Sequence, residues 1–379
     1  LAGVILAAII IAGCEGAKEP AAPQITSISS DSGPVGSSIT ISGANFGTQQ
    51  GGATITYRGV ALNATSWSNT GITAVISQGF SLGSGGIKVI TIDGARSNEF
   101  QFTVTPGIVS IDPLKGAVGT EVSIQGTNFG SSQGSSTVTF NGVSCGTAIS
   151  WSETLITVSV PIGATTGQVI VTVDSLASNA VVFTVSPAIT GLSPIKGSIG
   201  TNVTIVGTSF GASQGTSTVT FNGVDALTAS SWSNTSITIP VPAGSTTGPV
   251  VVTVNGQASN GLVFSVTPAI SNINLSSGPI GTSFIITGTN FGSVQGSSTV
   301  TFNGVVASVT SWSDTSITAV VPAGAAAGVN SVVVTVGGNT SNSVNFTVTP
   351  QLSGVSPSSG SGGTIITIYG TGFGAVQDT

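Results

Sequence analysis

Histidine and methionine are both absent from this sequence, and only 5% of its residues are charged. Without histidine, the chain lacks the commonest general base, the commonest metal ligand and any Ser–His or Cys–His nucleophile pair. Its twelve acidic residues are scattered and do not form the close carboxylate pair that a hydrolase needs. We therefore predict no enzyme activity, no catalytic residue, no metal site and no cofactor.

Positive charge is also scarce. The chain has six Lys and Arg residues, a formal net charge of −6 and no basic residue after Lys196. Nucleic-acid binding depends on cations that neutralise phosphates, so we exclude a nucleic-acid partner. Gly, Ser, Thr, Val and Ile dominate instead. This composition is too apolar for a disordered chain and predicts short β-strands joined by glycine turns.

The N-terminal segment 1–13, LAGVILAAIIIAG, is an apolar run without charge that ends at Cys14. A membrane span needs about 20 residues, but a signal-peptide core is this short. Ile11–Cys14 resembles a bacterial lipobox, in which small residues precede a cysteine that becomes lipidated. We predict a lipoprotein signal peptide at 1–13, lipidation at Cys14 and a tether at 14–23. An ordinary signal peptide or the end of a membrane helix is the alternative.

These predictions imply an exported protein, anchored to a membrane through its lipid at the bacterial cell surface, in the outer membrane or cell envelope. Residue 1 is leucine, so we expect that the sequence begins within a longer protein. The second cysteine, Cys145, follows an Asn-Gly turn and has no equivalent in the other repeats. We expect it to fill a half-buried site, with a reactive thiol as the alternative.

The remainder of the chain is a repeat. Gly281–Gly304, GTSFIITGTNFGSVQGSSTVTFNG, recurs with changes at 36–59, 119–142 and 200–223, and begins again at Gly363. A period of 81 to 83 residues is too long for a solenoid and matches a small domain. We predict four complete domains at 24–105, 106–186, 187–267 and 268–349, and a partial fifth at 350–379.

Alternation of apolar residues predicts the strands within each unit. In the second unit, Val122, Ile124 and Gly126 share one face of a strand, and Val138 and Phe140 share one face of the next. The Asn-Gly pair that follows favours a type I′ hairpin turn, because both turn residues need positive φ. About seven strands in some 80 residues predict a two-sheet antiparallel sandwich.

The fourth unit carries six motifs in order: Ser277–Pro279 with Gly281-Thr282, Thr289–Gly292, Phe302–Val305, Ser311–Thr318, Val321–Gly324 and the closing Val332–Val336. The unit therefore resembles an IPT/TIG domain, an immunoglobulin-like (E-set) module of plexins, transcription factors and bacterial surface proteins. The first unit departs most, with Tyr57–Val60 and Gln78–Phe80 in place of two motifs. The resemblance implies an all-β rod of tandem sandwiches. It also implies roles as spacers, as accessory domains beside enzymes or as DNA-contacting modules, of which charge excludes the last.

Several residues invite a functional interpretation that the repeats weaken. Trp67, Trp151, Trp232 and Trp312 hold one repeat position, so core packing is favoured over a sugar-stacking platform. Only Phe80 and Tyr369 are expected to be exposed aromatics without a repeat position.

Asp93 and Asp174 occupy a turn that is Asn255 in the third unit, so we interpret them as turn formers. The residue two after each tryptophan exchanges acid for amide, which a catalytic acid would not tolerate: Asn69, Glu153, Asn234 and Asp314.

We therefore expect a non-catalytic stalk or spacer that presents a downstream module, roughly 120–160 Å long for four units. The alternatives are adhesion or binding of a cell-surface glycan or protein by the units themselves, or an accessory array of a secreted carbohydrate-active enzyme. Because Lys196 is the only lysine of the third and fourth units, and lysines usually protect edge strands, we also expect self-association there.

Overall fold

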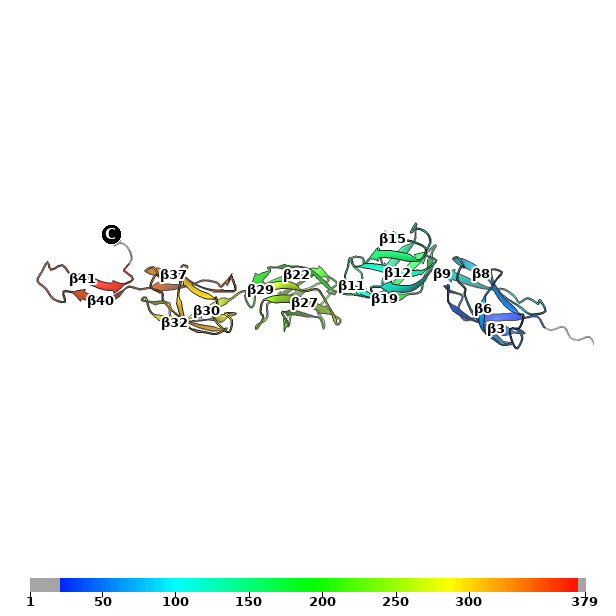
Figure 1. The fold of residues 1–379 in the computed structure, drawn as a ribbon, viewed down its shortest axis with the longest axis horizontal. Coiled ribbons are helices and arrows are strands. Elements are labelled where there is room, and N and C mark those ends of the chain that lie inside the picture. Colours follow the sequence, from blue (N-terminus) through cyan, green and yellow to red (C-terminus); the bar gives the residue numbers. More distant parts are fainter. Residues whose placement is uncertain (1–20, 374–379) are drawn as a thin grey trace, which may run out of the picture. The chain divides into compact units, whose positions relative to one another are not determined.

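The computed structural model of the protein describes residues 21–373. The predicted signal peptide and Cys14 lie outside the described residues. All regular secondary structure from residue 21 to residue 373 is β-strand. No helix in this range has the length and apolar character needed to cross a membrane. The all-β prediction is confirmed, and Figure 1 shows the strands gathered into successive domains along the chain.

The first domain contains two sheets whose strands lie in the orders β1-β3-β7-β6 and β2-β9-β8-β4-β5. The strands of the first sheet are β1 (Gln24–Ile28), β3 (Ser38–Ala44), β7 (Gly71–Val75) and β6 (Asn63–Trp67). Those of the second are β2 (Ser32–Pro34), β9 (Phe100–Thr105), β8 (Gly83–Ile90), β4 (Thr54–Tyr57) and β5 (Val60–Ala61).

The second domain repeats this arrangement, with sheet orders β10-β12-β16-β15 and β11-β19-β17-β13-β14, and with β18 beside β17. Its first sheet is made of β10 (Gly107–Asp112), β12 (Glu121–Thr127), β16 (Leu155–Ser159) and β15 (Ser150–Trp151). Its second is made of β11 (Lys115–Gly116), β19 (Val181–Val185), β17 (Gly167–Val173), β13 (Thr137–Phe140), β14 (Val143–Ser144) and β18 (Leu176–Ala177).

The third domain has the same two sheets, β20-β22-β26-β25 and β21-β29-β27-β23-β24, with β28 beside β27. The first comprises β20 (Ala188–Ser193), β22 (Asn202–Thr208), β26 (Ser236–Pro240) and β25 (Ser231–Trp232). The second comprises β21 (Lys196–Gly197), β29 (Leu262–Val266), β27 (Gly248–Val254), β23 (Thr218–Phe221), β24 (Val224–Asp225) and β28 (Gln257–Ala258).

The fourth domain again has orders β30-β32-β36-β35 and β31-β39-β37-β33-β34, with β38 beside β37. Its first sheet holds β30 (Ala269–Ile273), β32 (Ser283–Thr289), β36 (Ser316–Val320) and β35 (Ser308–Trp312). Its second holds β31 (Ser277–Gly278), β39 (Val344–Val348), β37 (Gly328–Val336), β33 (Thr299–Phe302), β34 (Val305–Val306) and β38 (Asn339–Thr340). The partial fifth copy forms a hairpin of β40 (Gln351–Ser356) and β41 (Thr367–Thr371).

Two features of the predicted sandwich are wrong. The second domain has ten strands, four of which are only two residues long, whereas alternation predicts about seven. The sheets are also not purely antiparallel, since β2 pairs in parallel with β9, β21 with β29 and β31 with β39. The first strand of each of these domains pairs in one sheet, and the short strand that follows it pairs at the edge of the other sheet: β1 then β2, β20 then β21, and β30 then β31. A pattern of buried residues cannot show that crossing, because both sheets bury the same kinds of side chain.

The interior of each domain follows the predicted alternation. In the third, Ile205, Val219 and Val252 are fully buried and belong to one cluster. The rings of Phe221 and Phe264 meet edge to face there, with centroids 5.4 Å apart. This arrangement favours aromatic pairs beyond the area they bury. Each domain therefore carries its own core.

The four tryptophans line the cores, as predicted. Trp67, Trp232 and Trp312 are partly buried against the clusters of their domains. In all four domains the indole Nε1 donates to the carbonyl of the phenylalanine in the Asn-Phe-Gly or Ser-Phe-Gly motif, at 2.8 to 3.0 Å. The indoles are therefore fixed by a hydrogen bond as well as by packing, and they are not free stacking platforms.

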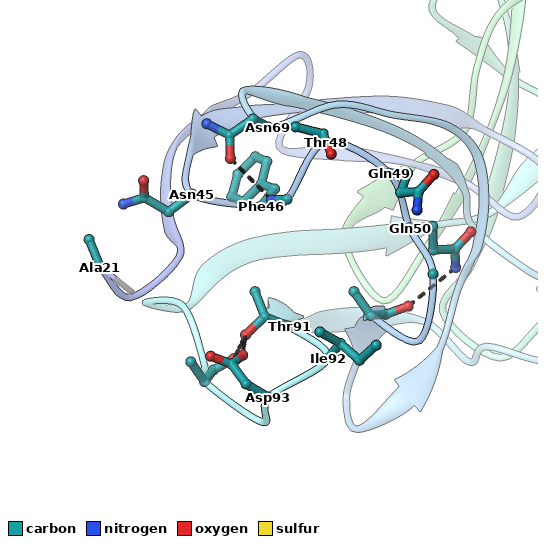
Figure 2. A pocket seen from close by; sticks show the side chains of 14 residues that line it. Ala21, Asn45, Phe46, Thr48, Gln49, Gln50, Asn69, Thr91, Ile92 and Asp93 are labelled. Carbon is teal, nitrogen blue, oxygen red and sulfur yellow. Dashed lines mark hydrogen bonds between the residues drawn. The ribbon is translucent and has the colours of Figure 1, made fainter. Parts of the chain in front are cut away.

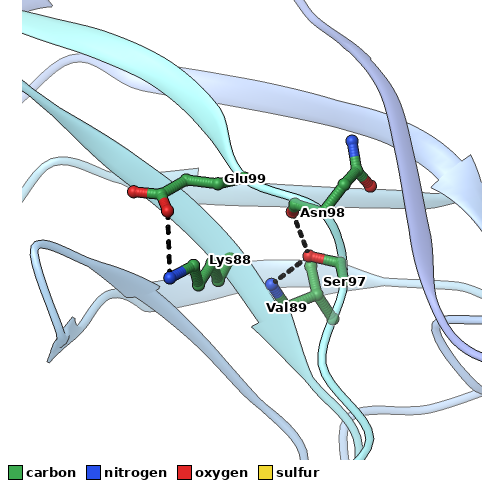
Figure 3. Close-up of polar contacts among 5 residues, drawn as sticks. All are labelled: Lys88, Val89, Ser97, Asn98 and Glu99. Carbon is green, nitrogen blue, oxygen red and sulfur yellow. Dashed lines mark hydrogen bonds and ion pairs between the residues drawn. The ribbon is translucent and has the colours of Figure 1, made fainter.

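A recurring Ser-Asn pair, which the motifs of the sequence did not reveal, ties the first strand of each domain to the opposite sheet. In the first domain, Asn98 accepts from the Ile25 amide and donates to the Ile25 carbonyl. Ser97 accepts from the Val89 amide, as Figure 3 shows. Asn179, Asn260 and Asn342 make the same two contacts in the other domains. The recurrence of Ser-Asn at the repeat period was the available signal.

The expectation that Phe80 is exposed is wrong. Its side chain is only 9% exposed, and its ring stands edge-on to that of Tyr57 with centroids 4.9 Å apart. The cause lies in two substitutions special to the first domain. Tyr57 donates to the carbonyls of Gly83 and Phe102, and Arg58 donates to the carbonyls of Ser81, Leu82 and Ser84. Together they hold the loop that carries Phe80 against the core. Tyr369, in contrast, is 53% exposed.

Candidate ligand site in the first domain

The main hollow of the first domain lies where three segments meet, and its volume is about 680 Å³. The loop 45–53 after β3 forms one wall, the β8–β9 hairpin turn forms another, and Ala21 closes one side (Figure 2). Its floor is apolar, since Phe46 and Ala53 are buried beneath it. The hollow is open to solvent and is wide enough for a small organic ligand.

The β8–β9 turn of the first domain is one residue longer than its counterpart in the second. The register Tyr57↔Ile87 and Ile55↔Val89 matches Phe140↔Val169 and Val138↔Val171, so Thr91 takes the place of Val173. In the first domain the Val89 amide donates to Ser97, eight residues later, and in the second the Val171 amide donates to Ser178, seven residues later.

The longer turn of the first domain exposes side chains, whereas the corresponding residue of the second domain is buried. Val173 is 5% exposed and belongs to the core of its domain, whereas Ile92 in the longer turn is 79% exposed. Thr91, which replaces the apolar Val173, instead donates to Asp93 Oδ1 within the turn. The first domain therefore has an open, polar-rimmed hollow at a point where the second has a buried valine.

The polar rim contains amides, hydroxyls and a single carboxylate. Gln49 and Gln50 stand on one side, Asn45 on the other, and Asp93 below them in Figure 2. The hydrogen bond from Thr91 lowers the pKa of Asp93 below its ordinary value, so this carboxyl is ionised near neutral pH. No Lys, Arg or Cys lines the hollow. It therefore offers acceptors, amide donors, hydroxyls and one negative charge, but no cation.

Of the acidic and amide residues that follow each tryptophan by two positions, only Asn69 lines the hollow. Asn69, Asn234 and Asp314 each accept, through Oδ1, from the glycine amide of the preceding Phe-Gly pair. This contact uses only an oxygen, which explains why acid and amide exchange freely at the position. Asp93 and Asp174 both lie in turns, as predicted, but only Asp174 adopts positive φ. Among residues 21–373, no three Cys, Asp or Glu side chains are grouped so that they could hold a metal ion.

A second hollow, of about 310 Å³, gathers basic residues that are distant in sequence. Arg58, Lys88 and Arg96 line it together with Glu99. The Arg58 guanidinium is engaged by backbone carbonyls, and Lys88 pairs with Glu99 at 2.9 Å (Figure 3). Two of the three cations are thus already partnered, so we regard this cluster as support for the fold of the first domain.

Cys145 lies in the second domain, half-buried, and is a free thiol. Burial raises the pKa of Cys145 to about 12. A thiolate is the reactive form of cysteine, so this thiol is unreactive at neutral pH. The structure thus places it as a space-filling residue, as the sequence predicts.

Comparison with known proteins identifies the repeat. A family model described as IPT/TIG domain matches residues 23–104, 106–185, 187–266 and 268–348. Human Fibrocystin-L is 35% identical over 199 residues, which is 50% of this chain and 5% of that protein. The chain thus spans a small part of this curated relative.

Solved structures show more distant similarities. The plexin A4 extracellular region is 15% identical, over 79% of this chain and 34% of that one, with a TM-score of 0.21. SGBP-B from a xyloglucan utilization locus in Bacteroides uniformis is 23% identical, over 43% of this chain and 49% of that one, with a TM-score of 0.20. At TM-scores this low, neither structure indicates a function for this chain.

Proposed function

Because this chain belongs to the IPT/TIG domain family, we propose that its tandem domains form a non-catalytic spacer on a bacterial cell surface. In this proposal a lipid on Cys14 holds the N-terminal end at the membrane. The domains then carry a further module away from it.

The observation that supports a spacer is the shortness of the junctions between successive repeat units, including the one that leads to the partial fifth copy. Strand β9 ends at Thr105 and β10 begins at Gly107; β19 ends at Val185 and β20 begins at Ala188. The next two junctions are equally short, at residues 267–268 and 349–350. Each contains a proline: Pro106, Pro187, Pro268 and Pro350. Proline fixes φ and removes a backbone donor, so one or two such residues allow little independent hinge motion.

Small-angle X-ray scattering of nested fragments tests the spacer. We expect fragments 21–105, 21–186, 21–267 and 21–349 to grow in maximum dimension by about 30–40 Å per added domain, as strands of this length predict. A matched control carries a flexible Gly/Ser insertion between Ser186 and Pro187, which should broaden the distance distribution. A nearly constant maximum dimension across the series would contradict the proposal.

Anchoring is tested separately, in bacteria that express the whole gene. Wild-type protein should incorporate labelled fatty acid and fractionate with membranes. A Cys14→Ala variant should do neither, whereas Cys145→Ala should behave as wild type. Membrane association that survives Cys14→Ala would rule out the lipid anchor but leave the spacer untouched.

A further inference from the structure

We propose that the hollow of the first domain, between the loop 45–53 and the β8–β9 turn, binds a neutral saccharide. This binding function is additional to the spacer and rests on different residues. The argument uses the shape of the hollow, its polar groups and the charges that it lacks.

The first step is that the hollow is particular to one domain. It depends on the longer turn that exposes Ile92, and on Thr91 in place of the buried Val173. The loop opposite also differs, because Gln49 replaces Ser132 and Ser213 of the second and third domains. Ala53, which also lines the hollow, replaces the serine found at Ser136, Ser217 and Ser298, whereas Phe46-Gly47 and Gln50-Gly51 keep the repeat pattern. The changes therefore concentrate on the two walls that face the hollow (Figure 2).

The second step is the chemistry of the walls. Asp93 supplies an anionic acceptor, while Gln49 and Gln50 supply both amide donors and carbonyl acceptors. Asn45 adds a carbonyl acceptor, and its amide already donates to the Ala22 carbonyl. Gln49 has no hydrogen-bond partner within the part of the chain that the structure describes, and Gln50 makes one long bond, to the Ala53 carbonyl at 3.4 Å. Hydroxyl groups both donate and accept, so a ligand rich in hydroxyls matches this mixed rim.

The third step concerns the apolar surface and the charge. Ile92 and Ala95 on the turn offer carbon surface against which the C–H face of a sugar ring can pack. No cation lines the hollow, and Asp93 would repel a phosphate or a carboxylate. An anionic ligand is therefore disfavoured, and a neutral saccharide satisfies both the rim and the floor.

Saturation-transfer difference NMR on the whole chain tests the proposal. The probes are neutral hexasaccharides of glucose, mannose, galactose and N-acetylglucosamine, with tetralysine and inorganic phosphate as charged comparators. At least one neutral hexasaccharide should show transfer. Its affinity should fall at least tenfold when Gln49→Ser and Asp93→Asn are combined. Both replacements already occur in the repeat, as Ser132 and Asn255.

The control variant carries Asp174→Asn in the second domain, where the turn is shorter and Val173 is buried. It should bind the same hexasaccharide as the unmodified chain does. Absence of transfer to every neutral hexasaccharide would overturn the proposal, as would equal affinity in the Gln49→Ser/Asp93→Asn variant. Preferential binding of tetralysine, lost on Asp93→Asn, would also overturn it and assign the hollow to a cationic ligand. None of these outcomes affects the scattering series that tests the spacer.

Discussion

At the scale of single residues, the repeat serves as an internal set of substitutions. Positions that look functional in one domain can be compared with the same position in three others. Ser245 is a clear case, because it is fully buried in the third domain and its Oγ has no hydrogen-bond partner. Its counterparts are Ala164 and Ala325, both buried. A hydroxyl buried without a partner destabilises the fold.

We therefore predict that Ser245→Ala stabilises the third domain by about 1–3 kcal/mol. Chemical denaturation of fragment 187–267, followed by Trp232 fluorescence, measures the change. Ser233→Ala is the contrasting variant, since Ser233 Oγ donates to the Ser236 carbonyl and accepts from the Ser236 amide. It should lose about 0.5–1.5 kcal/mol. A loss of stability on Ser245→Ala would show that this hydroxyl has a partner, such as a bound water.

Cys145 gives a pH-dependent prediction at the same scale. Its pKa of about 12 in the fold exceeds the ordinary cysteine value of about 8.5. Near pH 8, the unfolded chain should therefore react with iodoacetamide about a thousandfold faster than the folded domain. Because the folded state favours the protonated thiol, its contribution to stability is present below about pH 8.5 and is lost as pH rises toward 12.

Fragment 106–186, which lacks Cys14, allows the two alkylation rates to be compared with and without guanidinium chloride. Rapid alkylation of the folded fragment would mean that the thiol is accessible as a thiolate, and the interpretation as a space-filling residue would fail.

At the scale of strands and turns, the decisive positions are those where another part of the chain approaches the backbone closely. Gly207 is the second-last residue of the core strand β22, which ends at Thr208 just before the Ser-Phe-Gly motif. A Cβ there would overlap with the Ala188 carbonyl oxygen and with Cζ of Phe210. The glycine is thus required by the phenylalanine ring that folds back over it, and by the first strand of the domain.

We predict that Gly207→Ala destabilises the third domain by about 3 kcal/mol, because the strand or the ring must move. Gly191→Ala in the neighbouring strand β20 is the matched control, since nothing lies within 4 Å of the added Cβ. It should be neutral or slightly stabilising. Denaturation midpoints of fragment 187–267 compare the two. Equal midpoints would show that the contact at Gly207 relaxes at little cost.

At the scale of the whole molecule, the scarcity of charge favours association between copies of the chain. Apolar side chains remain exposed on the third and fourth domains, including Val263 (64%), Leu227 (86%) and Val329 (62%). Lys196, on the edge strand β21, is the only Lys or Arg of these two domains, so they carry little of the positive charge that commonly discourages strand-to-strand association.

We predict that fragment 187–349 self-associates at high concentration and that Val263→Lys reduces the association. Sedimentation velocity over a range of concentrations measures it. Fragment 24–186, which carries Arg58, Lys88, Arg96 and Lys115, is the control and should remain closer to monomeric. A clean monomer of 187–349 at high concentration would contradict the prediction.

Much of the fold could be predicted from the sequence because its determinants are local. Alternation identified the core strands, since each buried side chain lies two residues from the next. The turn Asn141-Gly142 was predictable because positive φ at both positions restricts the residue types, and both residues adopt it. The family resemblance followed from motifs that recur in order. The absence of histidine restricts the available chemistry through composition alone, whatever the fold.

Tertiary structure decided what depends on the meeting of distant segments. The parallel edge strands and the buried position of Phe80 arise from contacts between residues far apart in the chain. The hollow of the first domain has the same origin: one extra residue in the β8–β9 turn has its effect only opposite the loop 45–53. Sequence alone showed that the first repeat diverges, but only packing shows that the divergence exposes Ile92 and opens a polar-rimmed hollow.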